Sequence, residues 1–145
     1  MITVQEAKKK YRGICVPVLT VIKEDGSVDI DGIQSNIKWI IDQGAKEGNT
    51  ILLACGSGGD FTVLNTFERK AIIKAIAEVS RGRVPVMASV QSTDIRETIE
   101  LCQLCEDVGI DIFCGFSGSE LLYDDEKVIG VRTGDRGIDR HGKPK

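Results

Sequence analysis

The feature that most constrains this chain is an apolar run of strand length followed by a helical pattern, which occurs three times in succession. The apolar runs cover Gly13–Thr20, Ile51–Cys55 and Val84–Val90. The middle run shows no alternation of polar and apolar residues, which is typical of a strand covered on both faces. Strands that alternate with helices predict an α/β fold with parallel pairing.

Each predicted helix has a polar residue that can cap its start and a turn signal at its end. Isoleucines recur at three- and four-residue spacing through the first of them, as expected for a helix with one buried face. The predicted caps are Asp29 or Asp31 for the first helix, Thr66 for the second, and Ser92 or Thr93 for the third. The predicted ends are Gly44, Arg81–Arg83 and Gly109.

After the third helix the pattern changes. Ile110–Cys114 is a short apolar run that predicts a fourth strand. Glu120–Tyr123 and Val128–Thr133 are strand-like and flank the polar residues Asp124–Lys127, which predicts a β-hairpin. The remaining residues are polar and rich in glycine, and they predict a loop or tail.

The glycine-rich segment Gly56–Asp60, which follows the middle strand, is the candidate binding site. Ligands of α/β folds bind just beyond the carboxyl ends of parallel strands. Glycines allow backbone N–H groups to approach a ligand closely, and Ser57 adds a hydroxyl donor. The segment is therefore a candidate seat for a small carboxylate or phosphate. The alternative is a tight strand-to-helix turn that binds nothing.

Composition narrows the class of protein. The chain has 145 residues, of which 41% are hydrophobic and 28% charged, as in a soluble globular domain. A net charge of −3 gives no electrostatic support for nucleic-acid binding. No apolar run approaches the length of a membrane span, and the first ten residues do not resemble a secretory signal. These observations favour a cytoplasmic protein that binds neither nucleic acid nor membrane.

The cysteines indicate no disulfide framework. There are five, an odd number, and they lie in apolar contexts. Cys102 and Cys105 form a C-x-x-C motif, but no second pair follows and the single histidine, His141, lies far along the chain. We interpret the pair as buried thiols on one helix face and predict no metal site; the alternative is zinc or redox use.

Five sequence motifs between residues 11 and 111 resemble one family. They are P-V-L-T-V-I-K-E-D-G-S-V-D, C-G-S-G-G-D-F, E-R-K-A-I-I, V-P-V-M-A-S-V and T-D-I-R-E-T-I-E-L, in this order. They resemble the dihydrodipicolinate synthase / N-acetylneuraminate lyase family of (β/α)8-barrel lyases. The glycine-rich segment looks closest to the 2-keto-3-deoxy sugar-acid aldolases of that family, where G-S-G-G-E is usual and Asp60 stands here.

The resemblance implies a fold and a reaction. The fold would be a partial (β/α)8 TIM barrel of about four parallel strands in the order 1-2-3-4, with three helices on the outer face, followed by the hairpin and polar tail. The reaction would be Schiff-base chemistry on pyruvate or another 2-keto acid, without a cofactor. The substrate carboxylate would lie against Ser57 and the backbone N–H of Gly58, within the loop that Gly56 and Gly59 complete.

The resemblance also implies what is missing. The lysine of the family lies on the sixth strand and its tyrosine on the fifth, and this chain ends before either. Lys127, Lys143 and Lys145 occur late but in polar contexts that do not lower a lysine pKa, and Tyr123 lies in the predicted hairpin. We therefore expect a truncated polypeptide that is inactive alone. Its open barrel edges favour a homo-oligomer.

Residues 112–145 resemble an internal piece of electron-transfer flavoprotein–ubiquinone oxidoreductase. The segment Gly56-x-Gly58-x-x-Phe61 has phenylalanine in place of the third glycine of a G-x-G-x-x-G dinucleotide fingerprint. No flavin site is therefore implied. The predicted organisation is a lyase-like domain over 1–111 fused to a flavoprotein-like fragment over 112–145. Two alternatives remain: a fragment of a flavin-dependent oxidoreductase with an unrelated front, or a non-catalytic α/β module.

Overall fold

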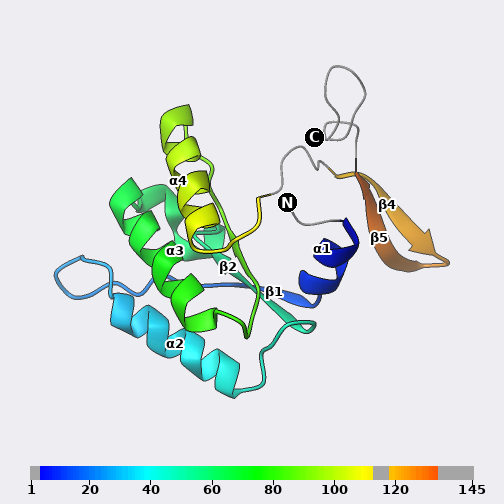
Figure 1. Ribbon diagram of the computed structural model, residues 1–145, viewed down its shortest axis with the longest axis horizontal. Helices are drawn as coiled ribbons and strands as arrows, with labels where there is room; N and C mark the ends of the chain where they lie inside the picture. Colours follow the sequence, from blue (N-terminus) through cyan, green and yellow to red (C-terminus); the bar gives the residue numbers. More distant parts are fainter. Residues whose placement is uncertain (1–3, 113–117, 134–145) are drawn as a thin grey trace. The chain divides into compact units, whose positions relative to one another are not determined.

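The computed structural model describes residues 4–112 and 118–133 of the chain (Figure 1). Two compact units are present, divided between Asp111 and Ile112. The first contains a parallel sheet with helices, and the second contains a β-hairpin.

The first unit is organised around a parallel sheet in the order β1-β2-β3. The strands are β1 (Ile14–Pro17), β2 (Thr50–Ala54) and β3 (Val86–Ala88). The order and the parallel direction confirm the prediction for these three strands. β1 and β3 are shorter than the predicted runs. Proline has no N–H to continue a ladder, which fits the end of β1 at Pro17.

Helices cover one face of this sheet. After the short α1 (Val4–Lys10) come α2 (Ile30–Asp42), α3 (Thr66–Ser80) and α4 (Ile95–Asp107). α3 packs between α2 and α4 and contacts β2 and β3, as Figure 1 shows. The core lies between these helices and the sheet, and its largest fully buried side chains include those of Ile33, Ile37, Leu52, Ile72, Ile73, Ile76 and Leu101.

Two predicted helix caps are wrong by one or two residues. Asn65, not Thr66, caps α3: its side chain accepts from the Glu68 N–H while the Glu68 carboxylate accepts from the Asn65 N–H, which is a capping box. Asp94, not Ser92 or Thr93, caps α4. In both places several residues with capping side chains stand in a row, and pattern alone does not choose among them. Asp29 caps α2, as one of the two predicted alternatives.

The predicted fourth strand is not formed by its described residues. Ile110–Ile112 carry no strand, and the last two residues of the predicted run lie outside the described chain. The Ile110 N–H donates to the carbonyl of Cys105 at 2.8 Å. That bond closes the end of α4, so the backbone of Ile110 finishes a helix instead of starting a sheet ladder.

The second unit is a two-stranded antiparallel hairpin of β4 (Gly118–Asp124) and β5 (Lys127–Thr133), which confirms the predicted hairpin. Most of its apolar side chains are exposed; Leu121, Tyr123, Val128, Ile129 and Val131 each expose at least 50% of their surface. None of the helices in the described ranges is long and apolar enough to cross a membrane. The predicted polar tail, 134–145, lies outside the described residues.

Candidate functional site

The glycine-rich loop lies at the carboxyl end of β2, where the sequence places it. Its residues Ser57–Gly59 form a single 3-10 turn, η1, which is followed by a second, η2, over Phe61–Val63. Cys55, which precedes the loop, and Asp60, its last residue, both adopt left-handed backbone conformations, with φ of 50° and 52°. Such conformations are costly for residues other than glycine. The loop is thus held at both ends in a constrained shape.

The residues after β1 hold the loop from one side. A Cβ atom on Gly59 would lie 2.7 Å from the carbonyl oxygen of Val18, so no larger residue fits there. The Thr20 hydroxyl donates to the Gly59 carbonyl at 2.7 Å. A Cβ on Gly58 would lie 3.1 Å from the Pro17 Cβ. The glycines therefore allow the carboxyl ends of β1 and β2 to approach closely.

The four predicted site residues do not have equal access to a ligand. Gly56 and Gly59 are buried, and the Gly59 N–H donates to the Gly56 carbonyl at 2.9 Å. Ser57 and Gly58 are exposed. Within the described residues, neither the Ser57 hydroxyl nor the Gly58 N–H has an acceptor. Two donors on adjacent residues are thus available to an anion, while the other two glycines shape the turn.

Arg69 of α3 reaches the carboxyl end of the neighbouring strand, β3. Its side chain is buried, with 4% exposed. One terminal nitrogen donates to the Gln91 carbonyl at 3.0 Å and the other to the Ser89 carbonyl at 2.9 Å. Its Nε is buried and has no acceptor in the described part of the chain. A buried donor without a partner costs about 1–3 kcal/mol, so this arrangement is not explained by stability alone.

The thiol of Cys55, immediately before the loop, is not a candidate nucleophile. Its Sγ lies 3.8 Å from the carbonyl oxygen of Arg69, to which it donates. Burial raises the pKa of Cys55 to about 11, although the nearby Arg69 charge acts in the opposite direction. The thiol is therefore protonated at neutral pH, and the thiolate is the reactive form.

Glu97 of α4 joins the start of α3 to the loop that follows β3. Its carboxylate accepts from the Ser92 hydroxyl at 2.6 Å and from the Thr66 hydroxyl at 2.7 Å. These hydrogen bonds, that of Ser92 first, hold the pKa of Glu97 below its usual value. The carboxylate is charged at neutral pH and links the start of α3 to the segment that follows β3.

Sequence reasoning placed the loop but missed Thr20, Arg69 and Glu97. One signal could have found Arg69: it lies three and four residues before Ile72 and Ile73, in line with the apolar stripe of α3. A charged residue on a buried stripe needs polar partners, which indicates a role at a strand end. The other two residues carry no comparable pattern in the sequence.

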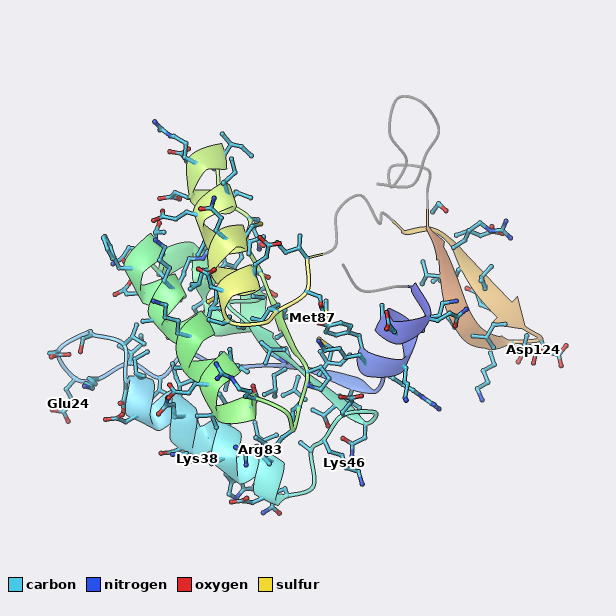
Figure 2. The ribbon with its side chains drawn as sticks, in the orientation of Figure 1. Glu24, Lys38, Lys46, Arg83, Met87 and Asp124 are labelled. Carbon is cyan, nitrogen blue, oxygen red and sulfur yellow. The ribbon has the colours of Figure 1, made fainter. Side chains whose placement is uncertain are left out.

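No lysine of the described residues is suited to form an imine. Of the described lysines, only Lys10 and Lys70 are partly buried, and each is paired with a carboxylate, of Asp111 and Glu100 respectively. An adjacent carboxylate favours the protonated amine, whereas a nucleophilic lysine must be neutral. The others are exposed; Figure 2 shows Lys38 on α2 and Lys46 in the turn before β2, at the amino end of that strand.

The opposite, amino end of the strands carries a cavity of about 500 Å³. Lys10, Tyr11, Arg83 and Val86 are among its lining residues. Beside it, the Asp111 carboxylate accepts from the Lys10 amine at 2.6 Å and from the Tyr11 hydroxyl at 2.9 Å. The cavity lies at the amino end of the strands, away from the loop, so it does not enlarge the candidate site.

The C-x-x-C motif lies on α4, as predicted. Cys105 is buried, and burial raises its pKa to about 11. Across the described residues no three histidine, cysteine, aspartate or glutamate side chains gather in a way that could hold a metal ion. Cys102 is only partly buried, so the prediction of two buried thiols is correct for Cys105 alone.

Comparisons with known proteins agree with the fold. Residues 10–115 match the model of the dihydrodipicolinate synthetase family. A putative 2-dehydro-3-deoxy-D-gluconate aldolase of Escherichia coli, YagE, is 42% identical over 102 residues, covering 70% of this chain and 32% of its own. A 4-hydroxy-tetrahydrodipicolinate synthase of Saccharophagus degradans is 33% identical over 100 residues, covering 69% of this chain and 33% of its own.

A solved structure of a relative also aligns with this chain. The crystal structure of YagE in complex with pyruvate aligns with a TM-score of 0.62 and 38% identity, over 70% of this chain and 33% of that one. The likeness confirms a part of a TIM-barrel-like fold. This chain spans about a third of the length of the curated relatives it matches.

Proposed function

This chain belongs to the dihydrodipicolinate synthetase family, and on that premise we propose that its loop Gly56–Asp60 binds the carboxylate of a small 2-keto acid such as pyruvate. The Ser57 hydroxyl and the Gly58 N–H are the donors. Gly56 and Gly59 give the turn its shape. The observation that carries the proposal is the pair of exposed donors at the carboxyl end of β2, which have no acceptor within residues 4–112 and 118–133.

The loop by itself supplies modest affinity. Two hydrogen bonds of about 1 kcal/mol each are set against an association cost of at least about 4 kcal/mol. Because these two contacts alone do not offset that cost, we expect a dissociation constant for pyruvate well above about 1 mM. The solved relative in complex with pyruvate supports this class of ligand.

The family reaction proceeds through an imine, in which a neutral lysine amine attacks the ketone and a water molecule leaves. We propose that this chain alone binds the keto acid and does not perform that step. The partly buried lysines, Lys10 and Lys70, are paired with carboxylates, and the remaining described lysines are exposed. The chemistry in the whole relatives would then need residues from beyond the matched third of their length.

Isothermal titration with pyruvate tests the binding proposal. Ser57→Ala removes one donor and is expected to weaken binding about fivefold or more, from the loss of about 1 kcal/mol. Ser35→Ala, an exposed serine of α2, is the matched control and should bind as the unmodified chain does. Equal affinities in the two variants would reject the assignment of Ser57.

Borohydride trapping tests the covalent step. The chain is incubated with pyruvate and borohydride and its mass is measured. We expect no stable adduct. An adduct that maps to one lysine, and that disappears when this lysine is changed to arginine, would overturn the proposal that the chain does not form the imine.

We also propose that the chain self-associates through its open sheet edges. β1 and β3 each pair on one side only among the described strands, and exposed strand edges favour edge-to-edge pairing. Analytical ultracentrifugation over a range of concentrations should show dimers or larger species. A monomer at all concentrations would contradict this.

The resemblance of residues 112–145 to a flavoprotein stays a prediction. Its described part, 118–133, is a hairpin. We expect the purified chain to show no flavin absorbance, because the sequence has no dinucleotide fingerprint. A bound flavin would instead favour the alternative of a fragment of an electron-transfer oxidoreductase.

A further inference from the structure

The two flanks of the loop Gly56–Asp60 share one neighbour, Arg69. The carbonyl oxygen of Arg69 accepts from the Cys55 thiol, which precedes the loop, with 3.8 Å between the two atoms. Its guanidinium carbon lies 5.6 Å from the centre of the Phe61 ring, which follows the loop. A cation over an aromatic face is attracted to it. Both ends of the loop are thus in contact with the same residue.

The guanidinium of Arg69 also forms hydrogen bonds with the segment that follows the neighbouring strand, β3. Its two terminal nitrogens donate to the carbonyls of Ser89 and Gln91, which follow β3. The planar fork of arginine can satisfy two carbonyls in a fixed geometry, which a lysine amine cannot do in the same way. The side chain therefore joins Phe61, which follows the loop, to the segment after β3, while the bond with Cys55 is made by the main-chain carbonyl.

We propose that Arg69 is a positioning residue for the keto-acid site: it holds the loop Gly56–Asp60 in fixed register with the carboxyl end of β3. The inference rests on the proposed function, in which the loop receives a carboxylate. Arg69 acts through the loop and needs no contact with the ligand. Its buried Nε, which has no acceptor among the residues that the structure describes, fits this role, because a well-packed apolar side chain would fill the space at lower cost without orienting two carbonyls.

The test compares three variants. Arg69→Met removes both carbonyl bonds and the charge. Arg69→Lys keeps the charge and loses the fork. Ile76→Val is the matched control, because Ile76 is fully buried on the same helix, two turns away from Arg69, and its truncation lowers stability without touching the loop.

Two readouts are measured on each variant: amide hydrogen exchange of Gly59 and Asp60, whose N–H groups are bonded within the turn, and affinity for pyruvate. We expect exchange to rise about tenfold in Arg69→Met and about threefold in Arg69→Lys, and by less than about twofold in Ile76→Val. Pyruvate affinity should fall in the same order, because binding depends on the placement of the donors.

The readouts separate the two claims. If the unmodified chain does not bind pyruvate, the proposed function fails, and hydrogen exchange still reports whether Arg69 holds the loop. If pyruvate binds and both Arg69 variants behave like Ile76→Val in exchange and affinity, the positioning role is wrong and the proposed function stands. Should Arg69→Met not fold, Arg69→Lys decides by the same comparison.

Discussion

The two ends of the parallel sheet differ in what their polar groups do. At the amino end, the Asp111 carboxylate is occupied by Lys10 and Tyr11, and Gly13 lies against the backbone of Asn49. At the carboxyl end, the Thr20 hydroxyl donates to the carbonyl of Gly59 in the loop. The exposed donors of Ser57 and Gly58 in the same loop have no partner among the described residues. In barrel folds, residues at the amino ends of the strands stabilise the fold, whereas ligands bind at the carboxyl ends. The predictions below test that division.

Gly13→Ala, at the amino end, should have the largest effect on stability. A Cβ there would lie 2.1 Å from the carbonyl carbon and oxygen of Asn49, and the backbone φ of +117° is unfavourable for alanine. We expect a loss of about 3 kcal/mol or more in the free energy of unfolding, measured by urea denaturation.

Gly82→Ala is the control for this variant. It also has a positive φ, +70°, but nothing lies within 4 Å of the added Cβ. It should cost about 1 kcal/mol, from backbone strain alone. Equal losses in the two variants would show that the contact with Asn49 contributes nothing.

Gly59→Ala, at the carboxyl end, should affect both stability and binding. The added Cβ would lie 2.7 Å from the Val18 carbonyl oxygen, so the loop must move away from β1. We expect a loss of about 2 kcal/mol in stability and a loss of pyruvate affinity. Gly130→Ala in the hairpin, with ordinary contact at 3.7 Å, should change neither. Retained pyruvate affinity in Gly59→Ala would argue against the loop as the site.

Thr20→Val, also at the carboxyl end, is a smaller perturbation of the same contact. It removes the hydroxyl that donates to the Gly59 carbonyl and preserves the shape of the side chain. Stability should fall by about 1 kcal/mol, measured by thermal unfolding. Thr62→Val, at an exposed position of η2, serves as the control. A loss no greater than that of the control would mean that the hydrogen bond is not formed in solution.

Asp111→Asn, at the amino end, should have the smallest effect, and one that depends on pH. Burial alone would raise the pKa of Asp111, but the hydrogen bonds from Lys10 and Tyr11 outweigh it and lower the pKa below the ordinary 3.8. A lowered pKa stabilises the fold above the unfolded-state pKa, and this contribution is lost as the pH falls through the folded-state pKa.

Stability of the unmodified chain should therefore fall more steeply below about pH 5 than that of Asp111→Asn. Asp42→Asn, an exposed carboxylate of α2, controls for the general loss of charge. Parallel pH profiles for the unmodified chain and Asp111→Asn would show that the amino-end contact does not contribute.

The strand–helix order, the strand pairing and the position of the loop could be predicted because they depend on local patterns. Apolar runs, helical spacing and a glycine cluster are visible in the sequence. The contacts that Thr20 and Arg69 make at the loop and its flanks could not be predicted, because tertiary packing brings these residues there. The same holds for Glu97, which links Thr66 to Ser92. Thr66 was predicted to cap α3, but its hydroxyl instead donates to Glu97 of the neighbouring helix α4.

The prediction of a fourth strand is wrong for its described residues, 110–112, for a related reason. Ile110 is apolar and buried, so the sequence pattern is satisfied, but its N–H closes α4. An apolar run predicts burial more firmly than it predicts the hydrogen-bond partner of each backbone group.

The most direct test of the division between the two ends is a pyruvate titration followed by amide chemical shifts. The account predicts that the resonances of Ser57, Gly58 and Gly59 move in a saturable way, while those of Gly13 and Gly82 at the amino end do not. Shifts confined to the amino end, or the absence of any saturable shift in the loop, would contradict the assignment of Gly56–Asp60 as the keto-acid site.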